Sequence, residues 1–256
     1  SAQYRLGKIG IAQGRLETAA NRFSLVTEGP LVSEALYNLG MVFFSQKNWK
    51  GTVRSYSSLL GNHPSSARIV QARYVLGVAH YKLGEEAAAV KLLEQYLRSG
   101  DRGRTESLWA HAFTGEVYQR RGQCSTAKRH FEVVLKEDIR FPPRAGSVLG
   151  LADCYYRKKD FVSAGKYYDL YFQDYAGSPQ STLARIRAGH SHLLAGRYRK
   201  ALENLQQVKK ENVPDDYGQW VMYWTARSQD LSGNQVIALK TYEALVASYP
   251  QGVPAL

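Results

Sequence analysis

The feature that most constrains the fold is a repeat that returns roughly every 37 residues along the whole chain. The pattern Ala-x-Tyr-x-Leu-Gly occurs at residues 2–7, 35–40 and 72–77, and weaker copies follow. The last position of the pattern is always small: Gly7, Gly40, Gly77, Gly115, Ala152, Gly189 and Ala226. Self-similarity at a fixed period of this length is typical of proteins built from stacked structural repeats.

Two further positions keep the same register in all seven copies. Twelve residues after each small residue stands a second small side chain: Ala19, Thr52, Ala89, Ala127, Ala164, Ala201 and Ala238. Four residues later stands a large apolar or aromatic one: Phe23, Tyr56, Leu93, Phe131, Tyr168, Leu205 and Tyr242. We interpret the small residues as points where two helices cross closely, with the large side chain filling the adjoining space.

The spacing inside each copy is helical. Leu36, Leu39, Gly40 and Phe43 follow the i, i+3, i+4, i+7 pattern of one helix face. Seven residues after each first small residue comes a turn position, which is Gly14, Lys47, Gly84, Gly122, Lys159, Gly196 or Gly233. Glycine suits a helix C-terminus because it adopts positive φ without a Cβ penalty. Each repeat is therefore predicted to be two antiparallel helices around a short turn.

A single helix pair cannot bury its own apolar face, so neighbouring pairs must stack into an all-α solenoid. We predict about seven antiparallel helix pairs in one solenoid domain over residues 1–256. The predicted repeats are residues 1–32, 33–69, 70–107, 108–144, 145–181, 182–218 and 219–250. Because no polar capping helix is visible at either end, we expect the sequence to be a segment of a longer protein.

The combination of Leu-Gly, an aromatic, alanine, a second aromatic and a closing proline resembles the tetratricopeptide repeat (TPR) family. Five of the six repeat intervals are three or four residues longer than the usual 34 of that family. The longer units, ending in Ser248–Pro250 or near equivalents, resemble those of bacterial envelope proteins. Examples are accessory proteins of the Tol–Pal system and outer-membrane-assembly lipoproteins. The resemblance implies a right-handed α-solenoid, and it favours the bacterial periplasm or outer membrane over the cytoplasm.

The resemblance also implies a concave binding groove lined by the first helix of each repeat. The groove positions are aromatic and basic in this sequence: Tyr37, Phe44, Tyr74, Tyr81, Lys82, Trp109, Arg120, Tyr156, Arg157 and Tyr223. Aromatic packing and cations of this kind suit an extended or helical segment with carboxylates. The chain is thus predicted to be a scaffold or adaptor that binds a protein or peptide segment, with no cofactor.

The chain is basic, with 34 Lys and Arg against 22 Asp and Glu and a net charge of +12. Part of the excess falls at the turns inside the repeats, on what should be one rim of the solenoid: Lys47, Lys50, Arg121, Lys158, Lys159, Arg197, Arg199 and Lys200. Cations near helix C-termini also favour the helix dipole, so part of this pattern is structural. The alternative function is handling of an anionic polymer, such as an exported polysaccharide, or an anionic membrane surface.

Other functional classes find little support. No nucleotide-binding, hydrolase or zinc-protease motif occurs, so no catalytic or metal site is predicted. His190 and His192 stand two apart on a helix and cannot chelate one ion. Glu116 and Asp153 fall at groove positions, which argues against a nucleic acid there. The sequence leaves the oligomeric state and the identity of the partner open.

The two cysteines fall in helices that should pack antiparallel. Cys124 begins the second helix of repeat four, and Cys154 lies late in the first helix of repeat five. A disulfide requires Cα atoms within about 7 Å, and it would favour an oxidising compartment. We favour the interpretation as two small, half-buried thiols and keep the disulfide as the alternative.

Overall fold

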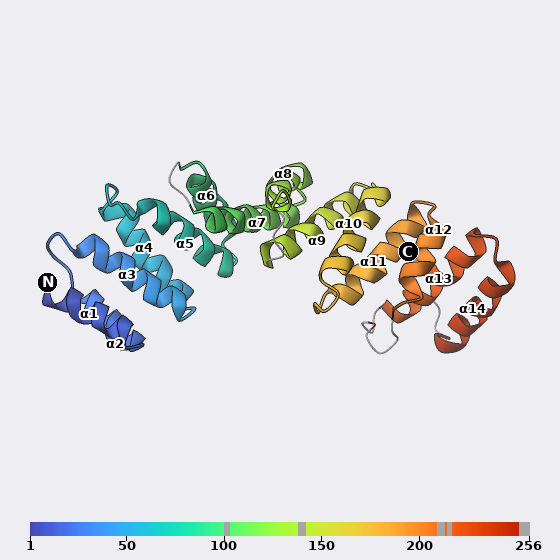
Figure 1. Cartoon of the computed structure of the whole chain (residues 1–256), viewed down its shortest axis with the longest axis horizontal. Helices are drawn as coiled ribbons and strands as arrows, with labels where there is room; N and C mark the ends of the chain where they lie inside the picture. The colour runs from blue at the N-terminus through green and yellow to red at the C-terminus, as the bar shows by residue number, and fades with distance from the viewer. Residues whose placement is uncertain (100–102, 138–141, 209–212, 214–216, 251–256) are drawn as a thin grey trace. The chain divides into compact units, whose positions relative to one another are not determined.

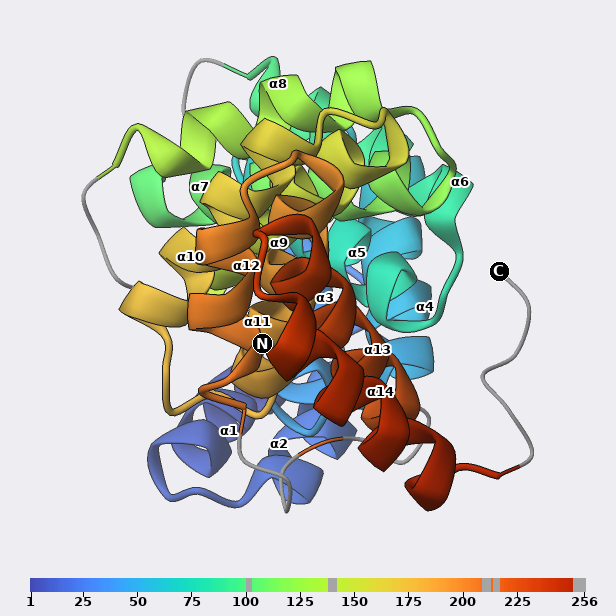
Figure 2. The same cartoon turned by 90° about the vertical axis from the view of Figure 1, so that its right-hand side faces the viewer.

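The computed structural model describes residues 1–99, 103–137, 142–208, 213 and 217–250. Over these residues the chain forms fourteen α-helices, and none of the described residues is in a β-strand (Figure 1 and Figure 2). The all-α prediction is therefore confirmed. The helices divide into two compact units, residues 1–118 and residues 119–256. The prediction of one domain over the whole chain stays a prediction.

The first unit is a row of helices in which each packs on the next from α1 to α6. The bounds are α1 Ala2–Ala12, α2 Leu16–Ser24, α3 Val32–Ser45, α4 Trp49–Asn62, α5 Ile69–Lys82, α6 Glu86–Leu97 and α7 Arg104–Arg120. The last two residues of α7 belong to the second unit. Its core is a series of small clusters between successive helices, of the kind that stacked pairs produce.

The second unit repeats this arrangement from α8 to α14. The bounds are α8 Cys124–Leu135, α9 Pro142–Arg157, α10 Phe161–Asp174, α11 Ser181–Leu194, α12 Tyr198–Leu205, α13 Gly218–Leu231 and α14 Gln235–Ser248. In addition to these neighbours, α11 contacts α13, so the first helices of two successive repeats lie side by side. None of the described helices is both long enough and apolar enough to span a membrane.

The turn inside each helix pair has one residue in the left-handed region. Positive φ is found at all seven turn positions given by the repeat: Gly14, Lys47, Gly84, Gly122, Lys159, Gly196 and Gly233. At the two positions without glycine the lysines take φ of 56° and 59°. The turn conformation is thus imposed by the helix pair, and glycine is only its least costly residue.

The small residues of the repeat mark close helix crossings, as predicted. A Cβ on Gly40 in α3 would come within 2.6 Å of the Tyr56 ring in α4. A Cβ on Gly189 in α11 would lie 2.5 Å from Leu205 in α12. Both large side chains stand sixteen residues after the small one and are buried. The register of the repeat is therefore the register in which paired helices interlock.

We expect Gly40→Ala to lower the free energy of unfolding by about 1–3 kcal/mol, because the added methyl group overpacks the crossing with Tyr56. Gly61→Ala in α4 is the matched control. A Cβ at Gly61 meets nothing within 4 Å, and alanine is the better helix former, so stability should hold or rise slightly. Urea unfolding followed by circular dichroism measures both. Equal effects of the two changes would contradict the crossing role of Gly40.

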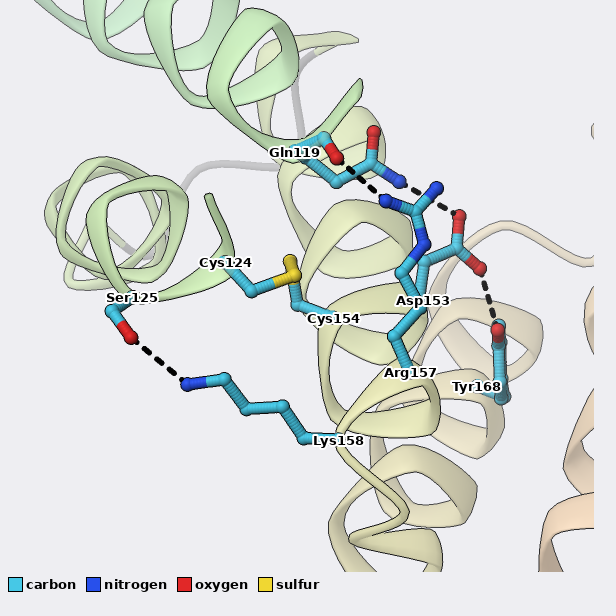
Figure 3. The surroundings of a disulfide bond; sticks show 8 residues. All are labelled: Gln119, Cys124, Ser125, Asp153, Cys154, Arg157, Lys158 and Tyr168. Atoms are coloured by element: carbon cyan, nitrogen blue, oxygen red, sulfur yellow. Dashed lines mark hydrogen bonds between the residues drawn. A yellow bond between two sulfur atoms is a disulfide. The ribbon is translucent and has the colours of Figure 1, made fainter. Parts of the chain in front are cut away.

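The two cysteines form a disulfide between α8 and α9, with Cα atoms 5.3 Å apart (Figure 3). The interpretation of Cys124 and Cys154 as two thiols was therefore wrong. Antiparallel packing brings the start of α8 to the end of α9, as the sequence indicated, but the distance depends on how far each helix is rotated about its axis. In the structure both helices are rotated so that the two Cβ atoms face each other across the space between α8 and α9, as a disulfide requires.

Candidate functional site

Groove side chains of successive repeats bond to one another by a regular rule. The residue at the twelfth position of a repeat, three before its turn residue, meets the ninth position of the next repeat. The Tyr81 hydroxyl donates to the Glu116 carboxylate, and the Tyr156 hydroxyl lies 3.0 Å from Nδ1 of His190. The Gln119 amide donates to Asp153 at 3.3 Å. Much of the polar lining of the groove therefore holds the first helices together.

In the first unit, three predicted groove residues gather around Phe113. The centres of the Tyr81 and Phe113 rings lie 4.4 Å apart. The Trp109 ring also stacks on Phe113, with ring centres 5.2 Å apart. The Lys82 ammonium lies 5.6 Å from the centre of the Tyr81 ring and 5.7 Å from that of Phe113. These distances are those of cation–π contacts. Tyr81, Lys82 and Trp109 thus form one aromatic and basic cluster around Phe113, and their role in binding stays a prediction.

The other predicted residues of the first unit are mainly packing residues. The Tyr37 ring meets Tyr56 edge-on at 5.8 Å, and the Tyr74 ring lies 5.1 Å from that of Tyr96. Burial raises the pKa of both the Tyr37 and the Tyr74 phenols. Phe44 packs edge-on against Trp49 at 5.4 Å. These contacts fill spaces between helices more than they present a surface.

The second unit contains a cavity of about 440 Å³ on its first helices. Its lining includes Tyr156 and Arg157 among the predicted residues, together with Asp153, Arg187, His190 and Trp224. We call it the groove pocket. Tyr223 does not line it and packs instead near Trp220 and Tyr242, with ring centres 6.3 and 6.4 Å away. Arg120 is exposed at the end of α7 and is also outside the lining.

Asp153 is the polar centre of the groove pocket. Its carboxylate accepts hydrogen bonds from the Arg187 guanidinium at 3.0 Å and from the Tyr168 hydroxyl at 2.5 Å, besides that from Gln119. Burial by itself would lower the pKa of Arg187, but the Asp153 charge and the Tyr168 and Tyr217 hydroxyls outweigh it, so that pKa is raised. Burial and then Asp153 raise the pKa of Tyr168. Arg187 is therefore permanently charged and firmly oriented.

An aromatic wall faces this polar centre. The His190 imidazole lies parallel to the Trp224 indole, with ring centres 3.9 Å apart and planes 9° apart. The Trp220 ring in turn stacks on the Trp224 ring, with ring centres 5.8 Å apart. Burial lowers the pKa of His190 to about 4, so the imidazole is neutral near pH 7. The wall is thus uncharged, and the cations of the pocket are its two arginines.

Arg157 is the outward cation of the groove pocket. It is exposed and donates to the main-chain oxygen of Gln119 at 2.7 Å (Figure 3). It makes no ion pair with any described residue. Because that bond uses one of five N–H groups, the rest of the guanidinium can bind an incoming acceptor.

Arg187 and Trp224 were missed because both stand at the sixth position of their repeats. The groove residues named from the sequence stand at the second, fifth, ninth, twelfth and thirteenth positions, as Trp109, Tyr74, Asp153, Tyr156 and Arg157 do. The missed signal was helical periodicity. The sixth, ninth and thirteenth positions follow i, i+3, i+7 and lie on one helix face. Asp153 was placed in the groove from its ninth position, which His190 shares in the next repeat, but neither residue was given a binding role.

The predicted rim residues are exposed in both units: Lys47, Lys50, Arg121, Lys158, Lys159, Arg197, Arg199 and Lys200. The Lys158 ammonium donates to the Ser125 hydroxyl at 3.0 Å, which ties the turn after α9 to the start of α8 (Figure 3). Their use as a binding surface stays a prediction. In the described part of the chain, no cluster of three or more His, Cys, Asp or Glu residues is arranged to hold a metal ion.

Comparison with solved structures shows the same fold in other helical-repeat proteins. A tetratricopeptide repeat protein from Parabacteroides merdae is 15% identical with a TM-score of 0.57, over 96% of this chain and 91% of that one. MamA is 19% identical with a TM-score of 0.57, over 68% and 91%. Kinesin light chain TPR-like repeats from Podosopora anserina are 18% identical with a TM-score of 0.52, over 75% and 100%. No curated protein matches the sequence.

Sequence comparison with protein families finds matches described as tetratricopeptide repeat at residues 1–67, 53–103 and 114–179. A second model of the same description matches residues 220–252. Together these segments cover more than half of the chain, and no enzyme family is indicated. Repeats of this kind generally serve as non-enzymatic scaffolds for protein–protein interaction. The chain belongs to the tetratricopeptide repeat family.

Proposed function

We propose that the groove pocket of residues 119–256 binds a protein segment in which a carboxylate side chain stands close to an aromatic or aliphatic one. The observation that carries this proposal is the pairing in one cavity of an outward arginine, Arg157, with the wall formed by Tyr156, His190 and Trp224. The carboxylate would bind the guanidinium through two parallel hydrogen bonds. The apolar side chain would cover the exposed parts of Tyr156 and His190, because Trp224 behind them is buried.

The charges of the groove pocket favour Arg157 over Arg187 as the ligand contact. Arg187 already donates to Asp153, and this pair is nearly neutral in sum. Arg157 has no acidic partner among the described residues, so the unbalanced charge of the pocket lies at its mouth. The cavity of about 440 Å³ is within the range of small ligand sites and suits one or two side chains rather than a whole helix.

A carboxylated polysaccharide is the competing ligand. It would use Arg157 and the rim cations, and its sugar rings would offer the aromatic wall only their C–H faces, without an aromatic or aliphatic side chain. The disulfide between Cys124 and Cys154 supports placing the protein in an oxidising compartment, in keeping with the bacterial cell envelope. We therefore include an envelope location in the proposal.

The proposal can be tested by selecting peptides from a random display library against the wild-type protein. We expect the selected peptides to combine Asp or Glu with an aromatic or aliphatic residue. Arg157→Glu should weaken their binding at least tenfold, which is about 1.4 kcal/mol. Arg199→Glu makes the same charge change on an exposed residue outside the groove pocket and should weaken binding less than twofold.

Three results would count against this function. The selected peptides could lack acidic residues, they could bind equally well after Asp and Glu are replaced by Asn and Gln, or both variants could weaken them alike. Polygalacturonate is the probe for the alternative. If the protein binds this polymer and the library yields no binding peptides, the result would favour the anionic-polymer function.

A further inference from the structure

A second cavity, of about 490 Å³, lies in residues 119–256 and shares no lining residue with the groove pocket. It is formed by α10, the end of α11, the following turn and the start of α12. Three cations from three different segments line it: Lys166 on α10, Arg197 in the turn and Lys200 on α12. We call it the basic pocket.

The side chains of the three cations of the basic pocket have no partner in the part of the chain that the structure describes. Among the described residues, none offers the side chains of Lys166, Arg197 or Lys200 an ion pair or hydrogen bond. The carboxylate in the lining is Asp169, which is already bonded to His192 Nε2 at 2.8 Å and to the Asn204 amide at 3.1 Å. Three cations against one carboxylate leave a net charge of two positive in this cavity.

The floor of the basic pocket is rigidly built. His192 is 1% exposed, and its ring lies over Gly165, where a Cβ would come within 2.7 Å of it. Its Nδ1 has no hydrogen-bond partner among the described residues. The bonds from His192 and Asn204 hold Asp169 from two other helices, α11 and α12. The cations thus surround a fixed concave surface rather than a mobile one.

Like charges gathered in a concavity repel one another and concentrate a field that attracts anions. Arginine offers a planar fork of donors that matches phosphate oxygens, and lysine supplies point charges that bind phosphate as well. A dianion would balance the net charge of the cavity, whereas a single carboxylate would balance only half of it.

We propose that the basic pocket binds a tetrahedral dianion, a phosphate or sulfate monoester group or the free ion. This proposal is independent of the groove pocket, because the two cavities have no lining residue in common. The same group could arrive on a phosphorylated protein or as free phosphate, and the test separates these two sources.

The experiment is a titration of the whole chain with inorganic phosphate against sodium chloride of equal ionic strength, followed by NMR of the backbone and side-chain N–H signals. We expect saturable shifts at Lys166, Arg197 and Lys200. The triple variant Lys166→Gln, Arg197→Gln, Lys200→Gln should bind phosphate at least tenfold more weakly. The matched control is Lys158→Gln, Lys159→Gln, Arg199→Gln, which removes three rim cations outside this cavity and should change binding less than twofold.

Circular dichroism must show that both triple variants are folded, and the wild-type shifts stand as a result independent of them. Shifts that grow linearly without saturation, or equal weakening in both triple variants, would overturn the proposal. A phosphoserine peptide that binds at least tenfold more tightly than inorganic phosphate would identify a phosphorylated protein as the source. Equal affinity would identify the free ion.

Discussion

Replacing both cysteines by serine should lower the free energy of unfolding of the oxidised protein by about 3–4 kcal/mol. The disulfide joins residues 30 apart in sequence, and a loop of that length has a closure entropy of this size in the unfolded chain. Cys124 and Cys154 are 5% and 3% exposed. Two buried serine hydroxyls would add a further small cost.

The measurement is urea unfolding of the wild type and of Cys124→Ser, Cys154→Ser, each with and without a reductant. Reductant should bring the wild type down to the stability of the double variant and leave the double variant unchanged. Intact mass under non-reducing conditions provides the control for the oxidised state. A wild type indifferent to reductant, or a mass showing two thiols, would contradict the prediction.

The disulfide affects the binding site because it lies at the end of α9 that carries the residues of the groove pocket. Cys154 follows Asp153 directly and precedes Arg157 by one helical turn. Gln119 bonds to both of those residues, and Lys158 bonds to Ser125 (Figure 3). The covalent link and three polar contacts thus fasten one end of α9, the helix that supplies Asp153, Tyr156 and Arg157 to the groove pocket.

The helix pairs could be predicted from sequence because their signals are local. A turn residue with positive φ must follow each first helix at a constant interval, and even Lys47 and Lys159 adopt it because the helix pair allows no other path. The crossings at Gly40 and Gly189 repeat the same interval to Tyr56 and Leu205. A period that returns seven times outweighs any single ambiguous residue.

The site could be predicted only in part, because its contacts depend on the rotation and offset between helices about 34 residues apart in sequence. Tyr156 and Arg157 were assigned to the groove, but the bond from Tyr156 to His190 and the stack of His190 on Trp224 depend on that offset. The disulfide needed the same information. Tyr37 and Tyr74 shared the groove register and yet pack between helices, since a tyrosine can serve either purpose.

Acid should destabilise the second unit through His190, by about 3 kcal/mol between pH 7 and pH 4. Burial lowers the native-state pKa of His190 to about 4, while the unfolded chain has a pKa near 6.5. Between these values the unfolded state binds a proton that the native state refuses. The stabilisation is therefore complete above about pH 6.5 and is lost as pH falls toward 4.

The surroundings of His190 explain why the native state refuses the proton. Its ring is covered by Trp224 on α13, and its Nδ1 faces the Tyr156 hydroxyl on α9. The same pocket holds Arg157 and Arg187, whose charges would repel an imidazolium, while Asp153 is engaged by Arg187. Protonation would place a cation in a poorly hydrated space where, among the described lining residues, no free carboxylate is available to it.

The test compares urea unfolding from pH 7 to pH 4 in the wild type and in His190→Phe, which keeps an aromatic ring against Trp224. Carboxylates titrate in both proteins, so the informative quantity is the difference between the two curves. We expect the wild type to lose about 3 kcal/mol more than the variant over this range. The control His63→Phe removes a histidine of residues 1–118, outside the groove pocket, and should follow the wild type. Parallel curves for the wild type and His190→Phe would show that the proton is not excluded from this site.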